Sequence, residues 1–345
     1  MSSVGQVVLG LTLGDPAGIG PEVMIKAAYD STLNPTWVRV LVGSPLLIRH
    51  WCRRLHHPLP PVWHPGIGPA SAAVVQWDPG PVLKSLPPPG LCQAVGARAA
   101  VSWIQAAVRA TLAGDLSGIV TGPINKAGLH RAGVKYPGHT EMLADLTDAR
   151  QVAMLLMGGG LRVVLATRHL PLADVARRLK SESIEEAATL LSQGLRWMGV
   201  RKQEIAIAAL NPHGGDQGVL GCEEKTVIAP AIRRLKRAGL NVVGPIPADV
   251  LFYQARKGRY GGVVAMYHDQ GLGPLKMLAF DSGINVTLGL PLVRTSPDHG
   301  TAYDIAGRGV ASARSALMAV RWAGLLARRP NPWRADSRNP IGRPI

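Results

Sequence analysis

Residues 261–309 read GGVVAMYHDQGLGPLKMLAFDSGINVTLGLPLVRTSPDHGTAYDIAGRG, and the fold assignment depends on this stretch. Its first residues, GGVVAMYHD, are an apolar run of the kind that forms a buried strand, and the run ends at His268 and Asp269. A second strand-like run, INVTLGLPLVRTS, covers residues 284–296. Glycines separate the runs, and polar side chains follow them. The stretch therefore predicts strands whose ends carry site-bearing loops.

The same pattern recurs along the whole chain, with strand-like runs alternating with segments of helical spacing. Residues 93–113 have clear helical spacing, and a last helix follows Ser312, which is placed to be its N-cap. This alternation predicts an α/β protein with a largely parallel central sheet, in which ligands sit beyond the carboxyl ends of the strands. The other main strand-like runs are 6–12, 37–43, 117–122, 161–169 and 204–213.

Composition favours a globular protein with a sizeable core. The 345 residues are 47% hydrophobic and 17% charged, which is enough for a sizeable core and about two domains. The N-terminus lacks the basic and apolar regions of a signal peptide, and no run approaches the roughly 20 apolar residues of a membrane helix. Three widely spaced cysteines predict a reducing, cytoplasmic location without disulfides.

The net charge of +16 raises the question of a nucleic-acid partner. The arginines are scattered over predicted helices and the C-terminal end, and only two Phe and six Tyr could stack on bases. We therefore expect an anionic small substrate or an arginine-rich surface, with neither nucleic acid nor membrane as a partner.

Three apolar runs end in histidine, at His169, His213 and His268. Taken singly, each is more often a hydrogen-bonded or surface residue than a ligand. Three at equivalent strand ends favour a divalent ion such as zinc or cobalt, with open positions for substrate. Asp249 and Asp269 are candidates for orienting a ligand imidazole, although each could equally be a loop cap.

A second group of residues suggests an anion site. His139 and Thr140 follow a glycine turn, where Thr140 could either cap the next helix or help to bind an anion at the helix N-terminus. Lys276, Asn285 and Arg294 lie in otherwise apolar segments. Cations there require a partner, and a phosphate or carboxylate of a substrate would supply it.

The common cofactor and nucleophile motifs are missing from the sequence. No GxGxxG follows a strand, and the glycines between Gly14 and Gly20 are spaced differently. There is no GxxxxGK[ST] and no GxSxG. A nicotinamide cofactor would therefore need another kind of fold.

An ordered series of motifs resembles the 4-hydroxythreonine-4-phosphate dehydrogenase family of pyridoxal phosphate biosynthesis. The motifs include LTLGDPAGIGPE, TGPINKAGL, GHTE, ATRHLPL, LNPHGG, MYHDQGL and GLPLVRTSPDHGTA, and the resemblance spans about residues 7 to 325. It implies a fold like that of isocitrate and isopropylmalate dehydrogenases. That fold has two α/β/α domains, with the active site in the cleft and at the dimer interface.

The resemblance also implies roles for residues. The metal ligands would be His169, His213 and His268, with His268 serving the other subunit of a homodimer that shares its active sites. The cofactor would be NAD or NADP, the ion zinc, magnesium or cobalt, and the less certain cofactor contacts Asp298, His299, Gly300 and Thr301. The substrate contacts would be His139, Thr140, Lys276, Asn285 and Arg294.

The implied reaction is oxidation of 4-phosphooxy-L-threonine to 2-amino-3-oxo-4-phosphooxybutanoate, which decarboxylates to 3-amino-2-oxopropyl phosphate. One alternative is a dehydrogenase of 4-phospho-threonate or 4-phospho-erythronate on the same scaffold. An alternative of another class is a metal-dependent phosphate-ester hydrolase. We expect a first domain of residues 1–128 plus 296–328, a second of residues 129–295, and a disordered tail at 329–345.

Overall fold

The computed structural model describes residues 6–68, 70, 72–80 and 83–334, which form two compact units. Unit 1 comprises the described residues up to Arg150 together with Leu290–Arg334, and unit 2 comprises Gln151–Gly289. These bounds differ from the expected 128/129 and 295/296, because the segment after residue 128 packs on the long helix of unit 1. Of the tail expected at 329–345, residues 335–345 lie outside the described residues.

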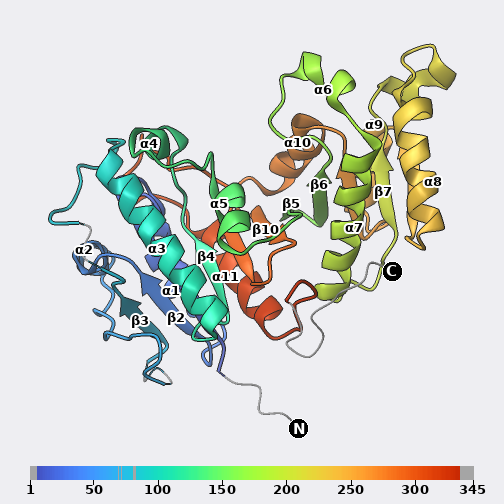
Figure 1. Ribbon diagram of the computed structural model, residues 1–345. Helices are drawn as coiled ribbons and strands as arrows, with labels where there is room; N and C mark the ends of the chain where they lie inside the picture. The colour runs from blue at the N-terminus through green and yellow to red at the C-terminus, as the bar shows by residue number, and fades with distance from the viewer. Residues whose placement is uncertain (1–5, 69, 71, 81–82, 335–345) are drawn as a thin grey trace, which may run out of the picture. The chain divides into compact units, whose positions relative to one another are not determined.

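Unit 1 is built on parallel strands in the order β3-β2-β1-β4-β11 (Figure 1). Apart from the first residue of β1, the residues of these strands are buried, as expected for strands covered on both faces. The strands are β1 (Val8–Thr12), β2 (Val38–Val42), β3 (Val74–Trp77), β4 (Gly118–Thr121) and β11 (Arg294–Pro297).

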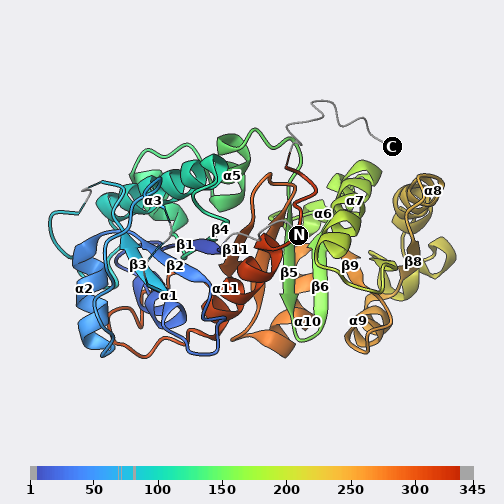
Figure 2. The same cartoon turned by 90° about the horizontal axis from the view of Figure 1, so that it is seen from below.

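Helices cover both faces of these strands. Figure 2 shows α3 on one side and α1 and α11 on the other, and α3 also packs against α4 and α5. Small residues let α3 lie close to β1 and β4, since alanine and glycine make up much of its buried face. The helices are α1 (Gly20–Ala28), α2 (Pro45–Arg54), α3 (Ala94–Ala113), α4 (Lys126–Arg131), α5 (His139–Leu146) and α11 (Arg314–Ala327).

Unit 2 has a mixed sheet in the order β10-β5-β6-β9-β7-β8. Its first three strands pair antiparallel, whereas β6, β9, β7 and β8 run parallel to one another. The strands are β5 (Ala153–Gly158), β6 (Leu161–Leu165), β7 (Ile205–Ala208), β8 (Val242–Ile246), β9 (Gly262–Ala265) and β10 (Ile284–Leu288).

Figure 2 shows α7 on one face of the unit 2 sheet and α10 on the other. A buried cluster of aliphatic side chains joins α9 and α10 to β6 and β9. The helices are α6 (Leu172–Arg178), α7 (Ser181–Trp197), α8 (Ala229–Arg237), α9 (Ala248–Arg256) and α10 (His268–Ala279). A 3-10 segment at Pro212–Gly218 and a π-helical turn at Glu224–Ile228 lie between β7 and α8.

The α/β fold expected from the sequence is confirmed, and four local predictions need correction. The run 284–296 is two strands, one in each unit, because Gly289 turns the chain with a φ of +90°. Helix α11 begins at Arg314, with Ala313 as its N-cap, so Ser312 lies just outside it. Residues 268–279, expected as loops, form α10. Thr140 is likewise not a cap, because α5 already begins at His139.

None of the helices within the described residues is long and apolar enough to cross a membrane.

Candidate functional site

Three histidines follow neighbouring strands of unit 2. His169 follows β6, His268 begins α10 after β9, and His213 follows β7. Because β9 pairs in parallel with both β6 and β7, the carboxyl ends of the three strands lie at one edge of the sheet. This placement is the one that the sequence predicts.

His169 and His268 lie beside each other, with ring centroids 5.8 Å apart and planes tilted by 43°. The Nδ1 atom of His268 lies 2.7 Å from Oδ1 of Asp269, so the carboxylate can fix the imidazole and leave Nε2 as the ligand atom. Both imidazoles belong to the same chain. Asp249 is exposed in the first turn of α9 and makes no hydrogen bond or ion pair with any described residue.

The donor set fits a divalent ion in part. Two adjacent imidazoles, one supported by a carboxylate, are typical ligands of zinc or cobalt. His213 does not join them within one chain, since the described residues contain no group of three or more His, Cys, Asp or Glu side chains placed to hold a metal.

The segment that carries His213 has an unusual backbone. Residues 213–217 all have positive φ, and three of them, His213, Asp216 and Gln217, are not glycine. The left-handed region costs a non-glycine residue roughly 1 kcal/mol or more. Such strain persists only where neighbouring groups hold the backbone, and it is typical of functional segments.

Glu224 holds this segment in place. Its side chain is buried, and Oε1 accepts hydrogen bonds from the backbone of Leu210 (2.8 Å) and Asn211 (2.7 Å). Its Oε2 accepts a third from Nδ2 of Asn211 (2.9 Å). Burial acts to raise the pKa of Glu224, but these hydrogen bonds outweigh it and hold the pKa below its usual value. Glu224 is therefore ionised and fixes the start of the His213 segment.

A cavity of about 540 Å³ lies next to His169. Its charged lining is basic, with Arg168, Arg178 and Lys180 beside Arg177, and Arg177 also pairs with Asp174. In the sequence, these cations look like arginines scattered over predicted helices. In the structure they make the surroundings of the histidine pair suited to an anionic substrate.

The two other predicted contacts of unit 2 lie on regular elements. Lys276 is on α10, half-buried, with Nζ 5.8 Å from the centroid of the Phe280 ring. Asn285 is inside β10, and its Oδ1 is buried without a hydrogen-bond partner among the described residues. A buried acceptor of this kind is expected to bond to a ligand or a water.

Unit 1 brings His139 and Arg294 together. Arg294 is only 2% exposed and donates from Nε and Nη2 to Oγ1 of Thr121, at 3.2 and 2.8 Å. Burial lowers the pKa of Arg294 to about 9, so the guanidinium stays charged at neutral pH and an anion beside it would be stabilised. Thr140 is buried in the first turn of α5.

His139 is neutral. Burial, and after it the positive charge of Arg294, lowers the pKa of His139 well below the usual value. A hydrogen bond to the Gly122 backbone raises this pKa, but by less. Because this hydrogen bond raises the pKa, the imidazole ring is its donor and the Gly122 carbonyl is its acceptor. The buried Nε2 has no hydrogen-bond partner among the described residues, which leaves it as an acceptor for substrate.

The predicted cofactor residues follow β11 and are tied to the loop after β1. Ile19 donates its backbone N–H to the carbonyl of Thr301 at 2.9 Å, and Asp298 donates its own to Oγ of Ser315 at 3.0 Å. Tyr303 donates to Oδ2 of the buried Asp15 at 2.6 Å. Burial raises the pKa values of both Asp15 and Tyr303.

Sequence reasoning missed Glu224, Thr121 and the basic cavity. For Glu224 the available signal was a pair of acidic residues, Glu223 and Glu224, shortly after the LNPHGG motif. Thr121 ends a buried strand, and this pattern does not indicate that its side chain bonds to Arg294 on β11. The structure brings together His169 with His268, and His139 with Arg294, while it leaves His213 outside the first pair.

The model of the family described as pyridoxal phosphate biosynthetic protein PdxA matches residues 45–323. A 4-hydroxythreonine-4-phosphate dehydrogenase from Beijerinckia indica is 42% identical over 91% of this chain and 94% of its own length. A D-threonate 4-phosphate dehydrogenase from Cupriavidus necator is 41% identical over 93% and 98%. The crystal structure of 4-hydroxythreonine-4-phosphate dehydrogenase from Klebsiella pneumoniae superposes with a TM-score of 0.84 at 38% identity, covering 95% of this chain and all of that one.

Proposed function

This chain belongs to the family of the pyridoxal phosphate biosynthetic protein PdxA and is an oxidoreductase, and from that premise we propose its reaction. The proposed activity is NAD(P)- and divalent-metal-dependent oxidation of 4-phosphooxy-L-threonine. The C3 hydroxyl loses its proton and carbon C3 transfers a hydride to NAD(P)+, which forms 2-amino-3-oxo-4-phosphooxybutanoate and NAD(P)H. This β-keto acid then loses carbon dioxide to give 3-amino-2-oxopropyl phosphate.

The observation that carries the proposal is the histidine pair at the end of parallel strands, next to a basic cavity. His169 and His268 present two imidazoles 5.8 Å apart, and Asp269 supports one of them. A divalent ion held by the three histidine ligands would act as a Lewis acid on the substrate hydroxyl and on the ketone that forms from it.

The chain's own residues would bind the ends of the substrate. Arg294 supplies a buried positive charge, and Lys276 and the cations near His169 supply others. His139 is neutral, so its Nε2 can accept a hydrogen bond from a substrate hydroxyl or a protonated phosphate. Asn285 offers an unbonded Oδ1 that can accept from the substrate amine. These contacts convert binding energy into orientation of the reacting carbon.

D-threonate 4-phosphate is the second candidate substrate. Relatives named for the two substrates are 42% and 41% identical to this chain, so overall identity does not separate them. The substrates differ at C2, where one has an amine and the other a hydroxyl. An acceptor-only group such as Asn285 Oδ1 bonds to either, but an ammonium gives the stronger, charge-assisted bond. This favours the amino acid.

A comparison of kcat/KM for the two substrates tests the assignment. NAD(P)H formation is followed with zinc, cobalt or magnesium added to metal-stripped enzyme, and inorganic phosphate is assayed in the same samples. We expect at least a tenfold preference for 4-phosphooxy-L-threonine and no phosphate release. Preference for the threonate would transfer the proposal to that substrate, and phosphate release without reduced cofactor would point to a hydrolase.

We further propose a cytoplasmic homodimer with shared active sites, in which His268 of one subunit completes the metal site formed by His169 and His213 of the other. The support is that the described residues of one chain contain no group of three such ligands placed to hold a metal, so the ligand set would be completed across a dimer. Mixing refolded His213→Ala and His268→Ala chains tests this. A mixed dimer with shared ligands contains one intact site and regains activity, whereas sites built from a single chain would stay inactive.

A further inference from the structure

The loop that follows β11, called the β11 loop below, covers residues 298–313 and leads to α11. Because β11, β4 and β1 run parallel, the loops after them lie at one edge of the sheet, where ligands of α/β proteins bind. The residues proposed to contact the cofactor, Asp298 to Thr301, begin this loop. Among them Gly300 is exposed, and a Cβ added there would meet no atom within 4 Å, so its backbone is open to a ligand.

A strained residue of the β11 loop is held from both sides. Ala302 has a φ of +40°, in the left-handed region that costs a non-glycine residue roughly 1 kcal/mol or more. Before it in the chain, the carbonyl of Thr301 accepts the N–H of Ile19 at 2.9 Å. After it, Tyr303 donates its hydroxyl to Oδ2 of Asp15 at 2.6 Å. Both partners belong to the segment between β1 and α1, so that segment holds the conformation of Ala302.

The loop after β1 has glycine where it comes close to the β11 loop. A Cβ added to Gly18 would lie 2.8 Å from the carbonyl oxygen of Thr301, so a larger residue would push the two loops apart. A third segment contacts both loops. Gly90 donates its N–H to the carbonyl of Ala17 at 2.8 Å, and a Cβ on Gly90 would lie 2.9 Å from the carbonyl oxygen of Tyr303. Close backbone packing therefore supports Tyr303, which is half-buried.

Asp15 is a carboxyl group that depends on its hydrogen bonds, because it is only 1% exposed. Its Oδ1 accepts the backbone N–H of Ala17 at 2.9 Å, and its Oδ2 accepts the hydroxyl of Tyr303. Burial raises the pKa of Asp15, and the two hydrogen bonds lower this pKa by less. The hydroxyl of Tyr303 therefore stabilises Asp15 and at the same time fixes the β11 loop to the segment after β1.

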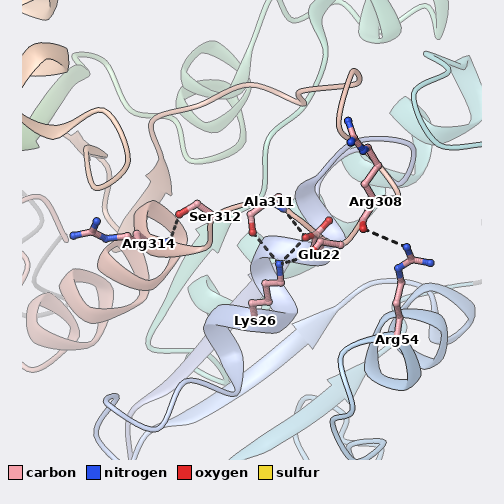
Figure 3. Close-up of polar contacts among 8 residues, drawn as sticks. Glu22, Lys26, Arg54, Arg308, Ala311, Ser312 and Arg314 are labelled. Atoms are coloured by element: carbon pink, nitrogen blue, oxygen red, sulfur yellow. Dashed lines mark hydrogen bonds and ion pairs between the residues drawn. The ribbon is translucent and has the colours of Figure 1, made fainter.

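The later part of the β11 loop is fixed separately, against α1 and α2. Figure 3 shows Lys26 donating to the carbonyl of Ala311 at 2.9 Å, and Glu22 accepting the N–H of Ala311 at 2.8 Å. In the same view Arg54 of α2 reaches the carbonyl of Arg308, at 3.3 Å from Nη2. A change at the start of the loop therefore leaves its later part anchored.

We propose that Tyr303 and Asp15 are positioning residues, whose hydrogen bond presets the β11 loop for the nicotinamide cofactor and so raises the cofactor affinity. The inference rests on the proposed dehydrogenase function and on the cofactor contacts proposed for residues 298–301. A loop that already has its binding conformation does not have to be ordered by the cofactor, so less of the binding free energy is lost. Without the hydroxyl of Tyr303, this ordering cost falls on cofactor binding.

Calorimetric titration with NAD and with NADP tests the proposal without any turnover. The variant Tyr303→Phe removes only the hydroxyl. We expect it to bind the cofactor that the wild type prefers at least about fivefold more weakly, which corresponds to one ordinary hydrogen bond. The matched control is Tyr29→Phe, which also removes one hydroxyl hydrogen bond from unit 1, the bond to the carbonyl of Pro58 at 2.7 Å. The control should keep the wild-type affinity within about twofold.

Hydrogen exchange of residues 298–309, measured by mass spectrometry, gives a second readout that needs no catalysis. In the cofactor-free protein this segment should exchange faster in Tyr303→Phe than in the wild type or the control, and bound cofactor should reduce the difference. In steady-state kinetics the KM for the cofactor should rise at least about fivefold in Tyr303→Phe, while kcat at saturating cofactor stays within about twofold.

An unchanged cofactor affinity in Tyr303→Phe would overturn the proposal, as would an equal loss of affinity in Tyr29→Phe. Equal loss of stability in the two variants, with the affinity of both unchanged, would show that the Tyr303 bond is merely structural. Wild-type protein that binds neither cofactor would contradict the dehydrogenase function together with this inference. Failure of the substrate assignment alone would abolish turnover but leave the titration result intact, so the two failures are distinguishable.

Discussion

At the scale of single residues, the candidate site depends on groups whose backbone conformation or buried charge is unfavourable in free energy. His213 has left-handed backbone, Glu224 is an ionised carboxylate that is 4% exposed, and Arg294 is a buried guanidinium. Each is compensated by defined partners, such as the three hydrogen bonds that Glu224 accepts from Leu210 and Asn211. Removal of the compensating group should therefore cost more than loss of an ordinary surface contact.

Glu224→Ala should lower the free energy of unfolding by about 2–3 kcal/mol, because three donors of the His213 segment lose their acceptor. Urea unfolding measures this, and Glu223→Ala is the matched control. Glu223 accepts a single separate bond, from Asn211 Nδ2, so its loss should cost less than about 1 kcal/mol. Equal costs for the two variants would show that Glu224 does not hold the segment.

His213→Gly should separate stability from activity. Glycine adopts positive φ without strain, so the variant should be as stable as the wild type or more stable by up to about 1 kcal/mol. It should nevertheless lose metal-dependent turnover, as should His213→Ala. Thermal unfolding and the NAD(P)H assay are run on the same preparations. Full turnover of either variant would remove His213 from the metal site.

His139 should make stability depend on pH. Its pKa is depressed in the folded state, so below about pH 6.5 the unfolded chain binds a proton that the folded chain does not. Stability should fall as the pH drops below 6.5, by up to about 1.4 kcal/mol per pH unit from this residue. Urea unfolding at pH 5 and pH 8 should show a smaller difference in His139→Gln. An unchanged difference would contradict a buried, neutral imidazole.

At the scale of elements, alternation of apolar and helical segments in the sequence predicted most strands and the placement of the three histidines. Periodicity could not show that residues 284–296 divide between two units, since the break depends on the backbone of Gly289. Residues 268–279 belong to a stretch whose glycines and polar side chains predict site-bearing loops. The helix forms there because its apolar side chains, such as Leu275, pack on the sheet.

Gly289→Ala should destabilise the protein by at least about 2 kcal/mol. The residue has a φ of +90°, and an added Cβ would lie 2.0 Å from the carbonyl oxygen of Gln151. Gly273→Ala is the control, since a Cβ there meets no atom within 4 Å and alanine favours helix α10. Urea unfolding should show opposite signs for the two changes. A harmless Gly289→Ala would contradict the turn that separates β10 from β11.

At the scale of the whole molecule, the net charge of +16 is explained in part by where the cations gather. They line a cavity beside His169 in unit 2, which suits a phosphorylated small molecule. The family motifs in the sequence predicted the enzyme class. They could not reveal Glu224 as a contributor, because its role depends on tertiary contacts that no local spacing encodes.

The proposed reaction is a metal-dependent oxidation followed by loss of carbon dioxide, and its product stoichiometry tests it most directly. Metal-reconstituted enzyme is supplied with limiting 4-phosphooxy-L-threonine and excess NADP or NAD, and reduced cofactor, carbon dioxide and inorganic phosphate are quantified together. We expect one reduced cofactor and one carbon dioxide per substrate consumed, with no inorganic phosphate. Release of phosphate with no reduced cofactor would contradict it.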